Sequence, residues 1–210
     1  MDCKFIGSNL KKSLEDVCKT KVSFENDGNC AALAEPYKGS LQKYKDSVDV
    51  IAGNPGSGVT YENIIKATKE CKEVAGDDVL IFSGKWEDGN VEPILGNPEL
   101  GLEKSKSIIK ELIDARADCI TLAMPGARFG ISTEEIRELV TFIHTYKPGT
   151  LALSFLDGSV EGSDEDTVRI CPIESKKTGA DIHAIGDAGL HGMSVLEDIY
   201  QMAITTKEDV

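Results

Sequence analysis

The chain has 210 residues, of which 40% are hydrophobic and 28% charged; these are ordinary values for a globular protein and exclude a disordered, collagen-like or fibrous chain. Its 23 basic and 36 acidic residues give a formal net charge of -13, so we expect no binding to nucleic acid or to an anionic membrane. The length fits one domain that spans residues 1–210.

Short β-branched or apolar runs alternate along the chain with longer segments of helical periodicity. This alternation predicts strands that each lead into a helix. The strands are expected at Lys21–Phe24, Val48–Ala52, Val79–Ser83, Cys119–Ala123, Leu151–Phe155 and Ile182–Ile185. The helices are expected within Met1–Lys19 and at Tyr61–Val74, Glu103–Ala115, Thr133–Thr145, Asp164–Thr178 and Ser194–Thr205.

The predicted strands are nearly continuous apolar runs, which favours a parallel sheet buried on both faces. Strands that each lead into a crossover helix fit most of a TIM-type (βα) barrel or an open doubly wound parallel sheet. A standard barrel has about 250 residues. We therefore predict an α/β fold, a TIM-type (βα) barrel that is short or incomplete, with about six βα units. The open doubly wound parallel sheet is the alternative.

Targeting signals and cysteine motifs are not found. Residues Met1–Ser8 have no apolar core of signal-peptide length, and no stretch approaches the roughly 18–20 apolar residues of a membrane span. We therefore expect a cytoplasmic protein. The 6 cysteines are scattered, without a CxxC pair, and predict neither a disulfide framework nor a zinc site.

Three of the predicted strand-to-helix loops have similar sequences. They are residues 53–64, 124–136 and 186–199. Each contains a glycine turn, a second glycine and an apolar residue before a candidate N-cap, which is Thr60, Ser132 or Ser194. Ser132 with Glu135 and Ser194 with Glu197 have the spacing of capping boxes.

These loops follow alternate strands, so three helix N-termini with free amides and positive dipole ends would surround one site at the carboxyl-end face of a barrel. We therefore predict a phosphate or carboxylate site there. The alternative is that glycine and a capping residue are simply how short loops of this kind are built. The predicted ligand-binding residues are Asn54, Gly56, Gly58, Arg128, Gly186, Gly189 and Gly192.

Four ionisable residues near the expected carboxyl ends of strands are the candidate catalytic groups: Lys85, Asp157, His183 and Asp187. Lys85 can bind an anion or, with a pKa lowered by burial, act as a Schiff-base amine. His183 can be a general acid or base if it points into the barrel, and a hydrogen-bonded core histidine is the alternative. Asp157 and Asp187 can take a proton, hold a divalent cation, or act as turn residues.

Several motifs of nucleotide-binding proteins and hydrolases are absent. The sequence has no GxxxxGK[ST], GxGxxG, GxSxG or HExxH, which disfavours ATP, NAD and serine-hydrolase chemistry. We predict no cofactor. A divalent metal is left open, because no ligand spacing identifies a site for it.

Four sets of residues carry a resemblance to a known group of proteins. They are Gly53–Thr60, Ser83–Lys85, Met124–Gly126 with Gly130–Ile131, and Gly179–Gly189. Together they resemble uncharacterised bacterial proteins that are often labelled haloacid dehalogenase-like hydrolases. The resemblance implies a TIM-type barrel shortened here by about two βα units at the amino end. The nucleophile motif of haloacid dehalogenases, DxDx[TV], is not found at a predicted first strand.

The leading hypothesis is a barrel-type enzyme, a lyase, an isomerase or an aldolase-like protein, that acts on a small phosphorylated or carboxylated metabolite. The glycine loops, Lys85 and Arg128 would bind the anion, and His183 and Asp187 would move protons. The alternatives are a noncatalytic ligand-binding or regulatory protein and a metal-dependent hydrolase. An incomplete barrel exposes a sheet edge, so we also expect a homo-oligomer.

Overall fold

The computed structural model describes residues 46–52, 60–77, 79–86, 92–157, 160, 164–186 and 194–207. The strands are β1 (Asp46–Ala52), β2 (Val79–Lys85), β3 (Cys119–Ala123), β4 (Leu151–Leu156) and β5 (Ile182–Ile185). The helices are α3 (Tyr61–Ala75), α4 (Leu102–Asp114), α5 (Thr133–Tyr146), α6 (Glu165–Lys176) and α7 (Leu196–Thr206). Each confirms a predicted element, with ends that shift by a residue or two. The strand expected at Lys21–Phe24 and the helix expected within Met1–Lys19 lie outside the described residues.

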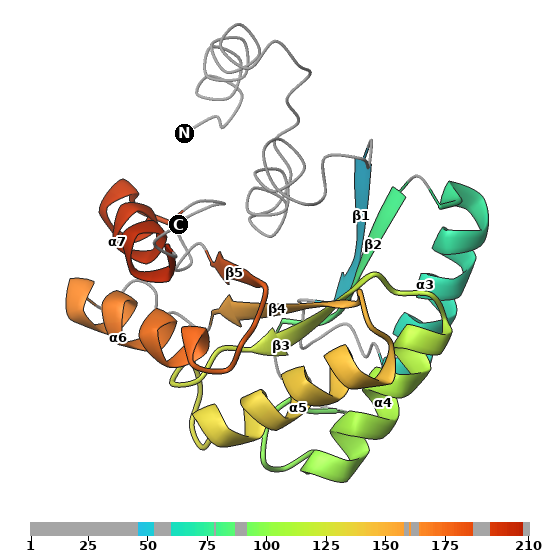
Figure 1. Ribbon diagram of the computed structural model, residues 1–210, viewed down its shortest axis with the longest axis horizontal. Helices are drawn as coiled ribbons and strands as arrows, with labels where there is room; N and C mark the ends of the chain where they lie inside the picture. Colours follow the sequence, from blue (N-terminus) through green and yellow to red (C-terminus); the bar gives the residue numbers. More distant parts are fainter. Residues whose placement is uncertain are drawn as a thin grey trace, which may run out of the picture.

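The strands are all parallel and pair in the order β1-β2-β3-β4-β5. Each connection moves to the next position in the same direction, and right-handed crossovers then place every helix on one side of the sheet. Figure 1 shows α3 to α7 along the outer side of a curved sheet. A doubly wound sheet reverses direction and carries helices on both faces, so that alternative is wrong for the described strands. The fold is a TIM-type (βα) barrel, of which these residues form a five-stranded arc.

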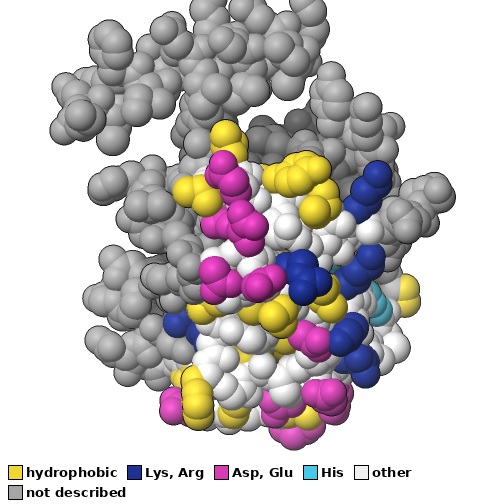
Figure 2. All heavy atoms as spheres, turned by 90° about the vertical axis from the view of Figure 1, so that its left-hand side faces the viewer, with side chains coloured by type: hydrophobic (Ala, Val, Ile, Leu, Met, Phe, Trp, Pro, Cys, Tyr) yellow, Lys and Arg dark blue, Asp and Glu magenta, His cyan; other side chains and the backbone are white. Residues whose placement is uncertain are grey.

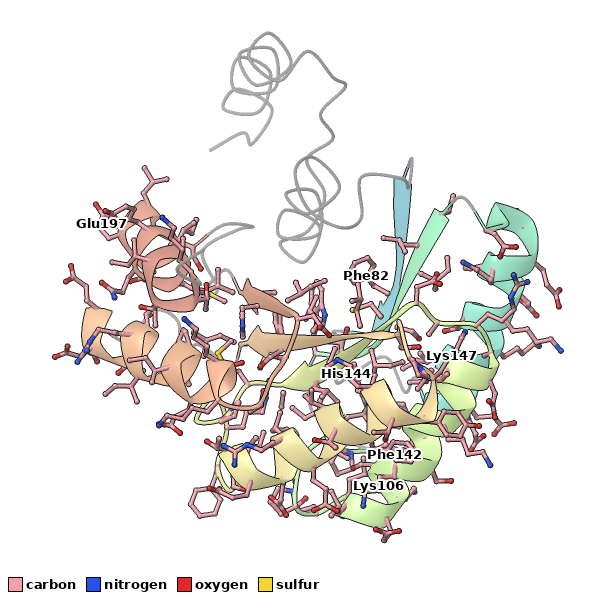
Figure 3. All side chains as sticks on the ribbon, in the orientation of Figure 1. Phe82, Lys106, Phe142, His144, Lys147 and Glu197 are labelled. Carbon is pink, nitrogen blue, oxygen red and sulfur yellow. The ribbon has the colours of Figure 1, made fainter. Side chains whose placement is uncertain are left out.

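Alternate strand residues line the inner face of this arc. They form an apolar group, called here the inner-face cluster, that contains no helix residue: Leu80, Phe82, Cys119, Leu153, Phe155, Ile182 and Ala184. Figure 3 shows Phe82 on the side of the sheet away from α4 and α5. Because successive side chains of a strand point to opposite faces, the residues between them face the helices. Ser83, for example, lies 2.6 Å from Thr68 of α3, hydroxyl to hydroxyl.

The largest core lies between the sheet and α3 to α5. Its helix residues recur at helical spacing and include Ile108, Ile109 and Leu112 of α4 with Ile136, Leu139, Val140 and Ile143 of α5. They pack against Ile120 and Leu122 of β3. Each buried aliphatic side chain of this size contributes about 1.5–3 kcal/mol. None of the helices among the described residues is both long and apolar enough to cross a membrane.

Two of the three predicted N-caps are confirmed. Thr60 Oγ1 accepts a hydrogen bond from the Asn63 amide of α3, and Ser132 Oγ accepts one from the Glu135 amide of α5, each at 3.3 Å. The N-cap predicted at Ser194 is wrong. Helix α7 is preceded by Val195, which provides no side-chain cap, and the Ser194 hydroxyl donates to the Gly186 carbonyl instead. The hydroxyl thus ties the start of α7 to the end of β5.

Helices α6 and α7 lie side by side with their N-termini together. The Asp198 side chain is buried in the first turn of α7. Burial raises the pKa of this carboxyl above its ordinary value of 3.8, and the nearby charges of Glu165, Glu197 and Asp164 raise it further. The ionised form of Asp198 is therefore less favourable in the folded protein than in the unfolded chain.

Replacement of Asp198 by asparagine is expected to stabilise the protein at neutral pH. A carboxyl whose pKa rises on folding destabilises the fold above that pKa, and the penalty vanishes as the pH falls below its unfolded value. Thermal unfolding should give a higher Tm for Asp198→Asn than for the wild type at pH 7, and equal values at pH 3. Glu197→Gln, at an exposed position one residue away, is the control. A Tm that is unchanged or lower at pH 7 would contradict the expectation.

Candidate functional site

The structure describes only some of the predicted site residues. Lys85, Arg128, Asp157, His183 and Gly186 are among them. The others lie outside the described residues and stay predictions: Asn54, Gly56, Gly58, Asp187, Gly189 and Gly192. Of the three predicted anion-binding loops, the one between β3 and α5 is described throughout.

Arg128 and Asp157 form an ion pair at the carboxyl-end edge of the sheet. Arg128 lies in the loop between β3 and α5, and Asp157 directly follows β4. Arg128 donates from Nε (3.3 Å) and Nη2 (3.1 Å) to the two carboxylate oxygens of Asp157. The Asp157 side chain is 7% exposed and that of Arg128 21%. The buried carboxylate therefore holds the guanidinium in one orientation, while part of the arginine stays accessible.

Two further polar atoms lie on the inner side of the arc. Thr121 Oγ1 and Trp86 Nε1 are buried and have no hydrogen-bond partner among the described residues. Thr121 follows Cys119 by two residues and so shares its inner face. The Trp86 ring packs against the inner-face cluster and stacks on Phe155, with centroids 4.7 Å apart and an interplanar angle of 14°. Unpartnered buried polar atoms are rare, and each calls for an explanation such as a water molecule, an ion or a functional role.

These side chains form a continuous column from the interior to the edge. Thr121 pairs in register with Leu153 of β4. Phe155, whose ring stacks on that of Trp86, lies two residues further along the same face of β4. Asp157, the ion-pair partner of Arg128, lies two residues beyond Phe155. Same-face neighbours on a strand are about 7 Å apart. We call Thr121, Trp86, Phe155, Asp157 and Arg128 the inner column.

Sequence reasoning identified Asp157 and Arg128 of this column. It missed Thr121. The available signal was a single hydroxyl within the otherwise apolar run Cys119–Ala123. A hydroxyl in a strand buried on both faces requires a partner, and this one has none among the described residues.

Lys85 does not lie on the inner face. It follows Ser83 by two residues, on the helix-facing side of β2, and it is buried. Its Nζ donates to the Glu92 carbonyl at 2.5 Å and lies 5.7 Å from the centroid of the Tyr61 ring. Lys85 therefore fastens the loop after β2 to the start of α3. The expectation that it meets a substrate in the barrel, as a Schiff-base amine or an anion ligand, finds no geometric support.

A carboxylate of the protein itself occupies the N-terminus of α3. Glu92 accepts a hydrogen bond from the Tyr61 amide, the first of the helix, at 2.6 Å. Lys104 of α4 lies 4.0 Å from the other carboxylate oxygen. The positive end of the helix dipole thus interacts with Glu92, which is the kind of contact predicted for an external anion at this loop.

His183 also faces the helices. It lies between Ile182 and Ala184, both members of the inner-face cluster, so its side chain points the other way. Its Nδ1 lies 3.0 Å from Ser175 Oγ of α6, and that hydroxyl donates to Ser154 Oγ of β4 at 2.7 Å. The interior orientation expected for a general acid or base is wrong, and the alternative of a hydrogen-bonded core histidine describes the side chain.

The Gly186 amide already has a hydrogen-bond acceptor. It donates to the Leu156 carbonyl at 2.8 Å, which extends the pairing of β4 with β5 by one residue. This amide does not point at an anion. The predicted ligand-binding role of Gly186 therefore finds no support in its backbone geometry.

No metal cluster is found in the part of the chain that the structure describes. No three His, Cys, Asp or Glu residues there are grouped so that they could hold a metal ion. The described cysteines, Cys71, Cys119 and Cys171, are free. Cys171 is buried, and burial raises the pKa of its thiol above the ordinary value of 9.0, which disfavours the reactive thiolate.

Comparison with solved structures finds proteins of low sequence identity. A tetrameric deoxyribose phosphate aldolase from Aeropyrum pernix has 15% identity and a TM-score of 0.49 over 78% of this chain and 71% of that one. A putative deoxyribose-phosphate aldolase from Toxoplasma gondii has 12% identity and a TM-score of 0.48 over 78% and 70%. Dihydrodipicolinate synthase from Bacillus anthracis has 14% identity and a TM-score of 0.41 over 90% and 68%. The assignment of the fold rests on strand order and not on these similarities.

The label of haloacid dehalogenase-like hydrolase, suggested by the sequence resemblance, is wrong, since neither the family model that matches the chain nor the solved structures described above point to it. One segment, Asp164–Val168, does have the DxDx[TV] spacing. Its first aspartate is the N-cap of α6 and the rest is the first turn of that helix, whereas the dehalogenase motif belongs at a strand. No match is found among the curated proteins. Residues 3–208 match the model of a family described as a domain of unknown function (DUF7916), and the chain belongs to that family.

Proposed function

We propose that the protein is a barrel-type enzyme, of the lyase, isomerase or aldolase-like kind, that acts on a small phosphorylated or carboxylated metabolite held at the inner column. The observation that carries the proposal is the Arg128–Asp157 pair at the carboxyl-end edge of the sheet. Ligands of barrel enzymes bind at this face. A planar guanidinium held by a buried carboxylate is suited to bind a phosphate or carboxylate.

The rest of the column fits the remainder of such a ligand. The Thr121 hydroxyl and the Trp86 indole N–H, both buried, can donate to carbonyl or hydroxyl oxygens. The stacked rings of Trp86 and Phe155 provide an apolar wall beside them. The ligand would therefore place its anionic group at Arg128 and its uncharged end toward Thr121. Asp157 and Asp187 stay the candidates for proton transfer in this proposal.

A noncatalytic ligand-binding protein is the second candidate, and one specific observation favours it. Two of the four candidate catalytic side chains, Lys85 and His183, face the helices and make structural contacts there. A protein that binds an anion without turning it over needs only the inner column. The two candidates differ in turnover and share the binding site.

The binding site is tested by replacing Arg128 with glutamine. A panel of inorganic phosphate, phosphosugars, phosphoenolpyruvate and small carboxylates is screened by thermal shift; a ligand at about 100 times its Kd adds about 2.7 kcal/mol. A hydrogen bond to a charged group contributes about 1.5–3 kcal/mol, so Arg128→Gln should weaken binding of the hit roughly tenfold or more. Arg169→Gln, at an exposed arginine on α6, is the matched control and should leave the Kd unchanged.

A second variant, Thr121→Val, distinguishes a role of Thr121 in ligand binding from a role in the stability of the fold alone. It removes an unpartnered buried hydroxyl at constant shape, so the ligand-free protein should become more stable, while the ligand should bind more weakly. A hit that binds Arg128→Gln and Thr121→Val as well as it binds the wild type would overturn the proposed site. Product formation from the hit, followed by NMR, supports the enzyme; binding without product supports the second candidate.

A further inference from the structure

The outer face of α7 carries an unusual number of exposed apolar side chains. Leu196 and Tyr200 are 73% and 68% exposed, and Val195 and Ile204 are also exposed. Leu196, Tyr200 and Ile204 are spaced four residues apart and so lie on one stripe of the helix. Ile170 adds an exposed apolar side chain on neighbouring α6. Large exposed apolar side chains gathered on one face mark a candidate interaction site. We call these five residues the apolar stripe.

Figure 2 views this side of the molecule. Hydrophobic side chains and carboxylates are interleaved on it, and lysine and arginine side chains gather toward the right of the view. Figure 3 places Glu197 on α7 at the far left of the molecule, well away from α4 and α5. The apolar stripe is therefore on the side of the molecule opposite to α3, and it is separate from the inner column.

Charges of opposite sign lie at the two ends of the α6–α7 face. The N-termini of the two helices lie together, because the charges of Asp164 and Glu165 act on Asp198 of α7. The C-termini also lie together, because Lys176 Nζ donates to the Lys207 carbonyl at 2.9 Å. The helices are therefore parallel. The exposed residues at the acidic end are Asp164, Glu165, Asp166 and Glu197, with Arg169 beside Asp166. Those at the basic end are Lys176, Lys177 and Lys207, with Glu174 beside Lys177. Each end keeps its excess of one sign of charge.

We propose that the α6–α7 face binds the same face of a second copy of this chain, with the two α7 helices antiparallel across a two-fold axis. Such an axis brings the acidic end of each copy against the basic end of the other, and it places the two apolar stripes in contact. Interfaces related by a two-fold axis are self-complementary in this way. Antiparallel packing also sets the opposed helix dipoles favourably.

The same charges argue against other partners. A nucleic acid or an anionic membrane presents one sign of charge over a wide area, so it would meet like charge at the acidic end of the face. A second copy offers both signs in the matching arrangement. The apolar centre with a charged rim has the usual composition of a specific protein interface.

Oligomeric state gives the first test. Sedimentation velocity of the full chain over a range of concentrations should show a dimer, and Tyr200→Glu should shift it to monomer by placing two carboxylates near the two-fold axis. Because Tyr200 is exposed, Tyr200→Glu should not lower the stability of the individual subunit, so the variant should still unfold cooperatively as a folded monomer. Val74→Glu is the matched control, since Val74 is also exposed but lies on α3, and this variant should stay dimeric.

Charge reversal tests the antiparallel arrangement itself. One variant, Lys177→Glu with Lys207→Glu, makes both ends of the face acidic. The other, Glu165→Lys with Asp166→Lys and Glu197→Lys, makes both ends basic. Each alone should be monomeric, and an equimolar mixture should form a heterodimer, because only the mixture pairs opposite charges at both ends.

Three results would overturn the proposal. They are a wild-type protein that is monomeric at every concentration, a dimer that survives Tyr200→Glu, and a mixture of charge-reversed variants that stays monomeric. A monomeric wild type whose apolar stripe instead captures acidic or basic peptides would assign the face to a different partner. None of these outcomes depends on ligand binding at the inner column.

Discussion

Asp118→Ala is expected to destabilise the protein by about 3 kcal/mol, because it leaves the buried ammonium group of Lys72 without its counter-charge. Lys72 Nζ lies 2.7 Å from Asp118 Oδ2 and also donates to the Val79 carbonyl at 3.0 Å. The same carboxylate oxygen accepts the Ile81 amide at 2.9 Å. One aspartate at the start of β3 therefore joins α3 to β2, and its removal frees two donors at once.

The two partners of this pair are not equivalent. The Lys72 side chain is 4% exposed and that of Asp118 25%. Asp118 can recover some hydration when its partner is lost, so Lys72→Met should cost less than Asp118→Ala. Asp118→Asn keeps an oxygen that can accept the Ile81 amide, so its loss of stability should lie between those of Lys72→Met and Asp118→Ala. Chemical denaturation measures the free energy of unfolding of the three variants. The difference between Asp118→Asn and Asp118→Ala separates the contribution of the charge from that of the hydrogen bond to the Ile81 amide.

Asp77→Ala is the matched control, because Asp77 forms an ion pair with Arg116 in which both side chains are exposed. Surface pairs contribute about 0–1 kcal/mol, so this variant should unfold close to the wild type. Equal destabilisation by Asp77→Ala and Asp118→Ala would show that the burial of Lys72 has no special energetic effect.

Gly84→Ala is the second change with a large expected effect, a loss of about 2–3 kcal/mol from forced overpacking. A Cβ atom at Gly84 would lie 2.7 Å from Thr121 Cβ and 3.0 Å from the Thr121 carbonyl oxygen in the neighbouring strand. Backbone cannot rotate away as a flexible side chain can. The variant must therefore push β2 from β3 at the level of Thr121, within the inner column.

A double-mutant cycle measures this contact. Thr121→Gly removes the atom that the new methyl group would strike, so it should recover at least about 1 kcal/mol of the loss in Gly84→Ala, beyond simple additivity. Gly149→Ala is the control, because a Cβ atom at Gly149 meets nothing within 4 Å. Its positive φ of 96° costs about 1 kcal/mol by itself. Additive effects at positions 84 and 121 would exclude the close approach of β2 and β3.

The two changes also bear on function. Gly84 allows β2 to approach β3 beside the unpartnered Thr121 hydroxyl, and Lys72–Asp118 holds those strands and α3 in place. If the inner column binds the ligand, Gly84→Ala should weaken binding as well as stability, whereas Asp118→Ala should affect stability alone while the protein stays folded. Kd values measured below the unfolding transition distinguish these effects.

The helices and strands were the most predictable part of the structure. Local sequence carries their signals: apolar stripes of helical period such as Ile136, Leu139, Val140 and Ile143, and N-caps such as Thr60 and Ser132. The N-cap at Ser194 failed because its hydroxyl found an acceptor outside the helix, the Gly186 carbonyl. A side chain able to cap a helix can also bond elsewhere, and the three-dimensional path of the loop decides between the two.

The faces of the strands were the least predictable part. Where one face of a strand is wet, polar and apolar residues alternate and mark the two sides. These strands are buried on both faces, so the alternation is lost. Lys85 was therefore expected at the substrate site although it faces the helices, and the sequence left the interior and core alternatives for His183 open. Thr121, on the inner face, was not noticed.

The sequence by itself determined that this protein is an α/β fold of strands alternating with helices, and it identified Arg128 and Asp157 as candidates for one site. Local periodicity and the position of charges after apolar runs are sufficient for that. Only the tertiary structure decided the sequential strand order, the face on which each strand residue lies, and the pairing of Arg128 with Asp157. Those properties depend on contacts between residues distant in the chain, because the pairing of strands, and not their composition, sets which side chains meet.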